Sequence, residues 1–117
     1  MKKVIITGAN GFVGSNVCKE LDSRGVKIFA VIKDENENID NIKELENVEI
    51  VYCELGEIET LSEKTSDRDI DVFYHFAWVG SAGPMRCDEE IQLQNALWTA
   101  KALRTADKMK CKKFVNA

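Results

Sequence analysis

VIITGANGFVG, which runs from Val4 to Gly14, is the stretch that decides the fold. Its first part is a β-branched apolar run, typical of a strand that is buried on both faces in a parallel sheet. Three glycines follow at the spacing G-x-x-G-x-x-G. Glycine lets a phosphate approach the backbone without meeting a Cβ, and the free N–H groups of a following helix attract anions. The stretch therefore predicts a strand, a phosphate-binding turn and a helix, which is the context that a dinucleotide fingerprint requires.

Length and composition favour one globular domain. The chain has 117 residues, of which 44% are hydrophobic and 31% charged, and its net charge is −4. An acidic chain gives no general reason to bind nucleic acid or an anionic membrane. It contains no apolar run of membrane-spanning length and no apolar segment typical of a signal peptide. We expect a cytoplasmic domain over residues 1–117, without nucleic-acid or membrane partners.

The four cysteines are Cys18, Cys53, Cys87 and Cys111, and they lie far apart without a C-x-x-C pair. With a single histidine in the chain, this spacing argues against a zinc site. Cys18 and Cys53 fall in a predicted helix and a predicted strand, where small buried apolar residues fit. We expect four reduced thiols and no metal.

Hydrophobic periodicity predicts strands alternating with helices. Strands are expected over residues 2–7, 26–33, 48–53, 71–76 and 112–117, helices over 12–24, 39–46, 57–65 and 88–110, and a loop over 78–86. In the first helix, Val13, Val17 and Leu21 are expected to face the sheet. Alternation with short connections indicates an α/β domain, a doubly wound parallel sheet in three layers. Right-handed crossovers and the fingerprint in the first turn imply the strand order 3-2-1-4-5.

The long helix predicted over residues 88–110 carries two apolar stripes. One holds Ile91, Asn95, Trp98, Ala102, Ala106 and Met109, and roughly opposite lie Leu93, Leu97 and Ala100. A helix that covers one sheet needs a single stripe. The second stripe could cover further parts of the same chain or form a homodimer with the equivalent helix of another subunit. The alternative is a few exposed leucines, which are common on protein surfaces.

The landmarks along the chain resemble those of the NAD-dependent epimerase/dehydratase family, within the extended short-chain dehydrogenase/reductase superfamily. The resemblance covers the whole chain in order and rests on the T-G-x-x-G-x-x-G of residues 7–14, Glu54-Leu55, His75-Phe76-Ala77-Trp78, Asn95, and Lys113-Phe114-Val115. It implies a Rossmann-type fold and a dinucleotide cofactor, NAD or NADP.

The resemblance also implies roles for single residues. Pyrophosphate is expected on the glycine turn, mainly through backbone N–H groups, with cofactor contacts from Gly8, Asn10, Gly11, Phe12, Val13 and Gly14. Glu54 and Leu55 are expected at the adenine, and Phe76, Ala77 and Trp78 at the ribose and nicotinamide. Asn95 is expected to make structural hydrogen bonds close to the cofactor. Two alternatives stay open, because Glu54 can be a solvated strand end and Asn95 a helix-surface amide. His75 is expected to be a buried strand residue, not a catalyst.

The end of the second strand departs from the pattern of NAD enzymes. These normally carry an acidic residue about 20 positions after the glycines, which binds the ribose hydroxyls. Here that position is Ile32, followed by Lys33 and Asp34. A lysine attracts the 2′-phosphate of NADP, whereas Asp34 can still serve NAD, and Lys33 can equally be a solvated strand end. Both residues are candidates for cofactor binding, and the cofactor stays open as NAD or NADP.

The second departure concerns catalysis. Enzymes of the family transfer protons with a tyrosine and a lysine in Y-x-x-x-K, but Tyr52 is followed four places on by Gly56 and Tyr74 by Trp78. No catalytic residue is therefore assigned. We expect the chain to be the N-terminal half of a longer enzyme, inactive alone, whose substrate-binding C-terminal part acts on a sugar nucleotide. A non-catalytic module that senses NAD(P) is the alternative, since it needs the same glycines and no tyrosine.

Overall fold

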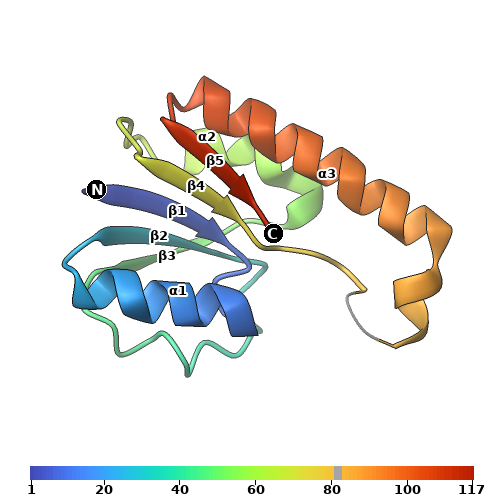
Figure 1. Cartoon of the computed structure of the whole chain (residues 1–117), viewed down its shortest axis with the longest axis horizontal. Helices are drawn as coiled ribbons and strands as arrows, with labels where there is room; N and C mark the ends of the chain where they lie inside the picture. Colours follow the sequence, from blue (N-terminus) through green and yellow to red (C-terminus); the bar gives the residue numbers. More distant parts are fainter. Residues whose placement is uncertain (81–82) are drawn as a thin grey trace.

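The computed structural model describes residues 1–80 and 83–117 and contains one five-stranded parallel sheet. Its order is β3-β2-β1-β4-β5 (Figure 1), as the alternation of elements predicts. The strands are β1 (Lys3–Thr7), β2 (Lys27–Ile32), β3 (Val48–Tyr52), β4 (Val72–His75) and β5 (Lys113–Asn116).

The first strand, β1, lies at the centre of the sheet. It pairs with β2 from Lys3 to Thr7 and with β4 from Val4 to Thr7. The side chains of Val4, Ile5 and Ile6 are fully buried, because both faces of the sheet are covered. The glycine turn thus leaves the sheet at the point where the strand order reverses, which is where open α/β sheets bind their ligands.

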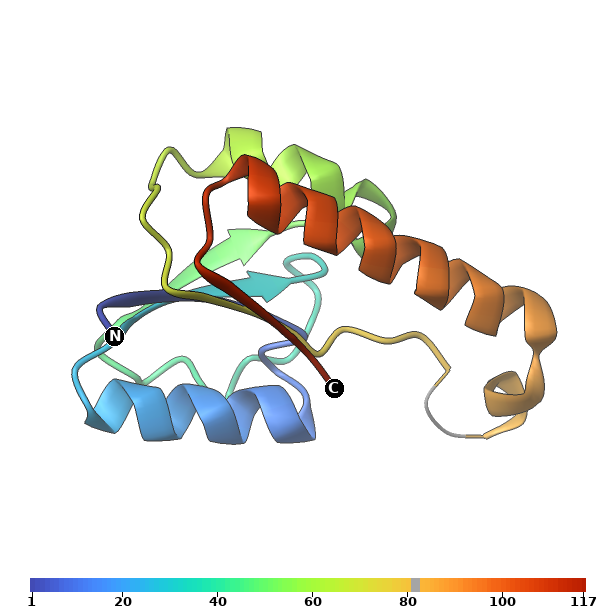
Figure 2. The same cartoon turned by 45° about the horizontal axis from the view of Figure 1, so that its top comes forward.

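Helices cover both faces of the sheet, so the predicted three layers are confirmed (Figure 2). Helix α1 (Phe12–Ser23) covers one face. On the other lie the 3₁₀ segment η1 (Leu55–Thr60), the short helix α2 (Leu61–Lys64) and the long helix α3 (Glu89–Lys108). Asp88 caps α3, because its carboxylate accepts a hydrogen bond from the N–H of Ile91 at 3.1 Å.

The inward face of α1 differs from the prediction. Val13 is 51% exposed, and the buried positions are Gly14, Ser15, Cys18 and Leu21. Val17 is partly buried against the same core. Compared with the predicted orientation, the helix is rotated about its axis. Its first turn packs against the end of β1 through Gly14, which has no side chain, and not through Val13.

The prediction of a helix over residues 39–46 is wrong. The structure has turns there, with hydrogen bonds from the N–H groups of Ile42 and Lys43 to the carbonyl of Ile39, both at 2.9 Å. Ile42 is nevertheless fully buried. One helical turn does not propagate in so short a segment, because nucleation is costly. In addition, the side chain of Asn38 accepts the N–H of Asp40 at 2.8 Å, which closes a local turn that competes with helix formation.

Two other predicted segments are partly changed. The helix predicted over residues 57–65 is the pair η1 and α2, with Ile58 and Leu61 buried as expected. The loop predicted over residues 78–86 includes a 3₁₀ turn, η2 (Pro84–Cys87), and residues 81–82 of that loop lie outside the described part of the chain. Within residues 1–80 and 83–117, every helix is too short or too polar to cross a bilayer.

Candidate functional site

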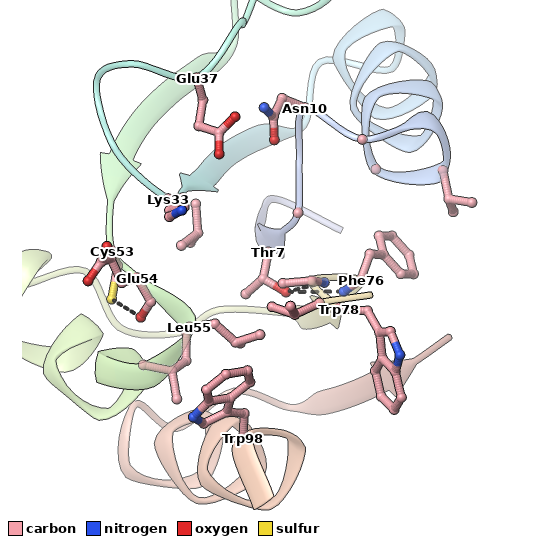
Figure 3. A pocket seen from close by; sticks show the side chains of 18 of the residues that line it. Thr7, Asn10, Lys33, Glu37, Cys53, Glu54, Leu55, Phe76, Trp78 and Trp98 are labelled. Carbon is pink, nitrogen blue, oxygen red and sulfur yellow. Dashed lines mark hydrogen bonds between the residues drawn. The ribbon is translucent and has the colours of Figure 1, made fainter. Parts of the chain in front are cut away.

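A cavity of about 890 Å³ lies beyond the carboxyl ends of the strands. Figure 3 shows that its walls come from the glycine turn, the connection after β2, the start of η1, the segment after β4 and helix α3. Its lining includes most of the predicted cofactor residues: Gly8, Asn10, Gly11, Phe12, Val13, Gly14, Lys33, Glu54, Leu55, Phe76, Ala77 and Trp78.

The glycine turn is shaped by close backbone contacts. Gly8 has φ +64°, and a Cβ there would lie 2.8 Å from the backbone nitrogen of Ala77. A Cβ on Gly14 would collide with the carbonyl oxygen of Gly8. Among the described side chains, none caps α1, so the N–H groups of its first turn remain available to a ligand. This wall can therefore hold an anion by backbone hydrogen bonds and the helix dipole.

The hydroxyl of Thr7 fixes the segment after β4 beneath this turn. It accepts hydrogen bonds from the N–H groups of Phe76 at 3.1 Å and Ala77 at 3.2 Å. Its single proton is therefore donated to Nδ1 of His75, 2.8 Å away, so the neutral ring carries its hydrogen on Nε2. His75 is only 1% exposed, and desolvation lowers its pKa to about 4. His75 is a buried strand residue, as predicted.

The wall opposite the turn is largely apolar. Leu55 and Ile58 from η1 lie there with Trp98 from α3, and Figure 3 shows Leu55 and Trp98 side by side. Glu54 is exposed at the rim. The thiol of Cys53 behind it donates to the carbonyl of Glu57 at 3.4 Å, and burial raises the pKa of this thiol.

Helix α3 holds the segment after β4 with two amide side chains. Asn95, 1% exposed, accepts from the N–H of Val79 at 3.0 Å and donates to the carbonyl of Val79 at 2.7 Å. Gln92 accepts from the indole N–H of Trp78 at 3.0 Å and donates to the carbonyl of Gly80 at 3.3 Å. Asn95 is thus a buried hydrogen-bonding residue behind the cavity wall and not a surface amide.

At the end of β2 only one of the two candidates reaches the cavity. Lys33 lines it, whereas the carboxylate of Asp34 accepts the N–H of Asn36 at 2.9 Å and lies outside the lining. Glu37, farther along the same connection, does line the cavity.

The structure adds lining residues that the sequence alone did not single out: Thr7, Val31, Glu37, Cys53, Gly56, Ile58, Val79 and Trp98. The threonine of T-G-x-x-G-x-x-G and the inward stripe of α3 were signals for Thr7 and Trp98. For Glu37 the local sequence offers none, since it is one of several carboxylates in a polar loop.

The sheet order, the glycine turn and the cavity at the switch point define a Rossmann-type α/β protein. The chain belongs to the NAD-dependent epimerase/dehydratase family, whose family model matches residues 4–117.

Three proteins that are similar to this chain are longer than it. A dTDP-6-deoxy-L-talose 4-dehydrogenase (NAD(+)) from Aggregatibacter actinomycetemcomitans is 38% identical over 78 residues, which cover 64% of this chain and 27% of that protein. An epimerase from Methanothermobacter thermautotrophicus superposes with a TM-score of 0.81 at 28% identity, over 98% of this chain and 34% of that one. A UDP-glucose 4-epimerase from Thermotoga maritima gives 0.77 at 19% identity, over 97% and 37%, a likeness of fold alone. The chain thus spans about a third of the length of these solved structures.

Proposed function

We propose that residues 1–117 bind NAD or NADP and form the cofactor-binding part of a nucleotide-sugar epimerase, dehydratase or reductase. The observation that carries this proposal is the cavity at the switch point, with a glycine turn and a helix N-terminus on one side and an apolar wall on the other. Its volume of about 890 Å³ lies within the range of small-molecule sites.

Each wall suits one part of a dinucleotide. The first-turn N–H groups of α1 face the position for pyrophosphate, and Gly8 and Gly14 leave room for it. Leu55 and Trp98 offer apolar surface for the adenine. The segment from Phe76 to Trp78 borders the position for nicotinamide. When bound, nicotinamide supplies the hydride chemistry, and these residues orient it.

The same residues offer no proton-transfer pair, so we propose that the 117 residues alone do not turn over a substrate. Neither Tyr52 nor Tyr74 has a lysine four places on. His75 is buried, and its Nδ1 already accepts the proton of Thr7. The sugar-nucleotide class of substrate is supported by the names of the relatives, which act on or bind dTDP- and UDP-sugars.

Calorimetric titration tests the cofactor proposal directly. NAD⁺ or NADP⁺ should bind to the chain, weakly because only part of a complete site is present. No binding of either dinucleotide at 10 mM, roughly 2.7 kcal/mol of binding energy, would refute the proposal. Assays with dTDP- and UDP-sugars should show no turnover. Cofactor binding without turnover by the full-length protein would favour the NAD(P)-sensing module.

We also propose that helix α3 pairs with its equivalent in a second copy. Its outer stripe stays exposed, with Leu93 at 72% and Leu97 at 46%, which supports an apolar contact that the single chain does not make. Light scattering should show a dimer that Leu97→Glu dissociates. Leu103→Glu is the matched control, since Leu103 is 52% exposed but lies off the stripe. A monomer at millimolar concentration would refute the pairing.

A cytoplasmic location is proposed from the thiols. Cys18 and Cys53 are buried, and burial raises the pKa of Cys18 to about 12, so this thiol stays protonated and inert. When the protein is purified without reductant, unfolded and treated with a thiol-reactive reagent, all four cysteines should react as free thiols. A disulfide in material isolated from its native cell would contradict this location.

A further inference from the structure

The ribose end of the cavity lacks the carboxylate that the fold normally places there. That position, at the end of β2, is Ile32, which is 0% exposed and packs in the core. Asp34 does not replace it, because its Oδ1 is bonded to the N–H of Asn36 at 2.9 Å and its side chain lies outside the cavity lining. An ionised acceptor for ribose hydroxyls must come from elsewhere.

Glu37 is the carboxylate that the connection after β2 brings to this place. It lines the cavity with Asn10 and Lys33, and Figure 3 shows its side chain pointing inward beside Asn10, past the end of β2. The other carboxylate of the lining, Glu54, lies across the cavity at the end of β3 (Figure 3).

The backbone that carries Glu37 is tied to the glycine turn. The side-chain amide of Asn10 donates to the carbonyl of Asn38 at 3.2 Å, and the amide of Asn41 donates to the carbonyl of Asn10 at 3.0 Å. The N–H of Glu37 donates to the carbonyl of Asp34 at 3.3 Å. Because these bonds fix the connection against the turn, Glu37 is held at a set distance from the position for pyrophosphate, as a ribose acceptor must be.

We propose that the carboxylate of Glu37 accepts hydrogen bonds from the hydroxyls of the adenosine ribose, and that it makes this site select NAD over NADP. The proposal rests on the dinucleotide binding proposed above. A carboxylate can accept both hydroxyls of a vicinal diol in charge-assisted hydrogen bonds. The same carboxylate repels a 2′-phosphate. In addition, residues 33–40 hold four carboxylates and one ammonium group, that of Lys33, so the net negative charge of this segment disfavours the extra phosphate of NADP.

The test is calorimetric titration of the chain with NAD⁺ and NADP⁺. NAD⁺ should bind at least about tenfold more tightly, and Glu37→Gln should weaken NAD⁺ about fivefold or more while leaving NADP⁺ unchanged or tighter. Asp34→Asn is the matched control, one charge removed from the same connection, and should change either affinity less than about twofold. Glu37 is exposed, so the variant should melt at the temperature of the wild type.

The outcomes distinguish the role proposed for Glu37 from the dinucleotide binding on which it rests. Equal binding of the two cofactors, tighter binding of NADP⁺, or an unchanged NAD⁺ affinity in Glu37→Gln overturns the role of Glu37 while dinucleotide binding stands. Tighter NADP⁺ binding that Lys33→Ala removes would assign the selection to Lys33 instead. Failure of both cofactors to bind refutes the proposed function, and the role of Glu37 with it.

Discussion

The glycine turn of residues 8–14 and the connection of residues 33–47 border the same cavity but are held in different ways. The turn is set by backbone contacts, such as the N–H of Gly11 donating to the carbonyl of Gly8 at 3.0 Å. The connection contains no helix or strand in its described residues and is fastened by side chains. The amides of Asn10 and Asn41 tie it to the turn, and Asn47 binds Asp22 of α1. The turn is therefore sensitive to an added Cβ, and the connection to the loss of its amide side chains.

The largest effect is expected where the turn is tightest. Gly14→Ala places a Cβ against the carbonyl of Gly8 and 2.9 Å from Cα of Ala9. Both neighbours are backbone and cannot move aside, so we expect a loss of about 4 kcal/mol in the free energy of unfolding, above the usual cost of overpacking. Urea unfolding measures it. Gly11→Ala, whose Cβ would meet only the carbonyl of Gly8 at 3.3 Å, should cost less than about 1 kcal/mol. Equal costs for the two variants would contradict this account of the turn.

The next test asks whether the irregular connection is part of the core. Ile42 is 1% exposed and packs with residues of α1 and β2. Ile42→Ala should therefore cost about 3 kcal/mol in urea unfolding, as for other buried isoleucines. Ile39→Ala, at a partly buried position three residues earlier, should cost about half as much. A silent Ile42→Ala would show that the connection detaches from the core.

Acid should destabilise the folded chain through His75, the buried histidine at the end of β4. The pKa of His75 is lowered to about 4 by burial, against about 6.5 in the unfolded chain. Below pH 6.5 the histidine therefore binds a proton in the unfolded state but not in the folded state. Stability falls as the pH is lowered from 6.5 to about 4, where His75 is also protonated in the folded state. Between pH 7.5 and 5 the loss should be about 2 kcal/mol. His75→Gln should remove that part of the pH dependence, and an unchanged slope would show that another group causes it.

A smaller effect is expected from the hydroxyl that joins the turn to β4. Thr7→Val keeps the shape but leaves the N–H of Ala77 and Nδ1 of His75 without their partner, so it should cost about 1.5 kcal/mol in thermal unfolding. Thr7→Ser keeps all three hydrogen bonds and should recover most of this loss. If Thr7→Ser were destabilised as much as Thr7→Val, keeping the hydroxyl would not restore stability, and this account of the Thr7 hydrogen bonds would be contradicted.

The sequence predicted the regular parts because their signals are local. Val4, Ile5 and Ile6 form an apolar run that only a buried strand accommodates, and the glycines fix the turn after it. Asp88 before the first turn of α3 marks where that helix begins. Strand order then followed from handedness and the position of the turn.

The parts that were missed depend on distant partners. Ile42 and Leu45 have helical spacing, but the segment is held by amides that bridge residues far apart, such as Asn10 and Asn38. Trp98 was placed on the inward stripe of α3, yet its position at the cavity depends on how far that helix extends past the sheet. Val13 was turned outward by the backbone contact of Gly14, which no apolar periodicity reveals.

The place of β1 between β2 and β4 has a consequence during synthesis. On the ribosome β1 and β2 are made first, but Val72, which pairs with Val4, follows roughly 40 residues after Ile32, or about 2–8 s later. Until then one side of β1 keeps its N–H and C=O groups open to other chains or to chaperones. The central strand of the finished sheet is, for those seconds, an edge strand.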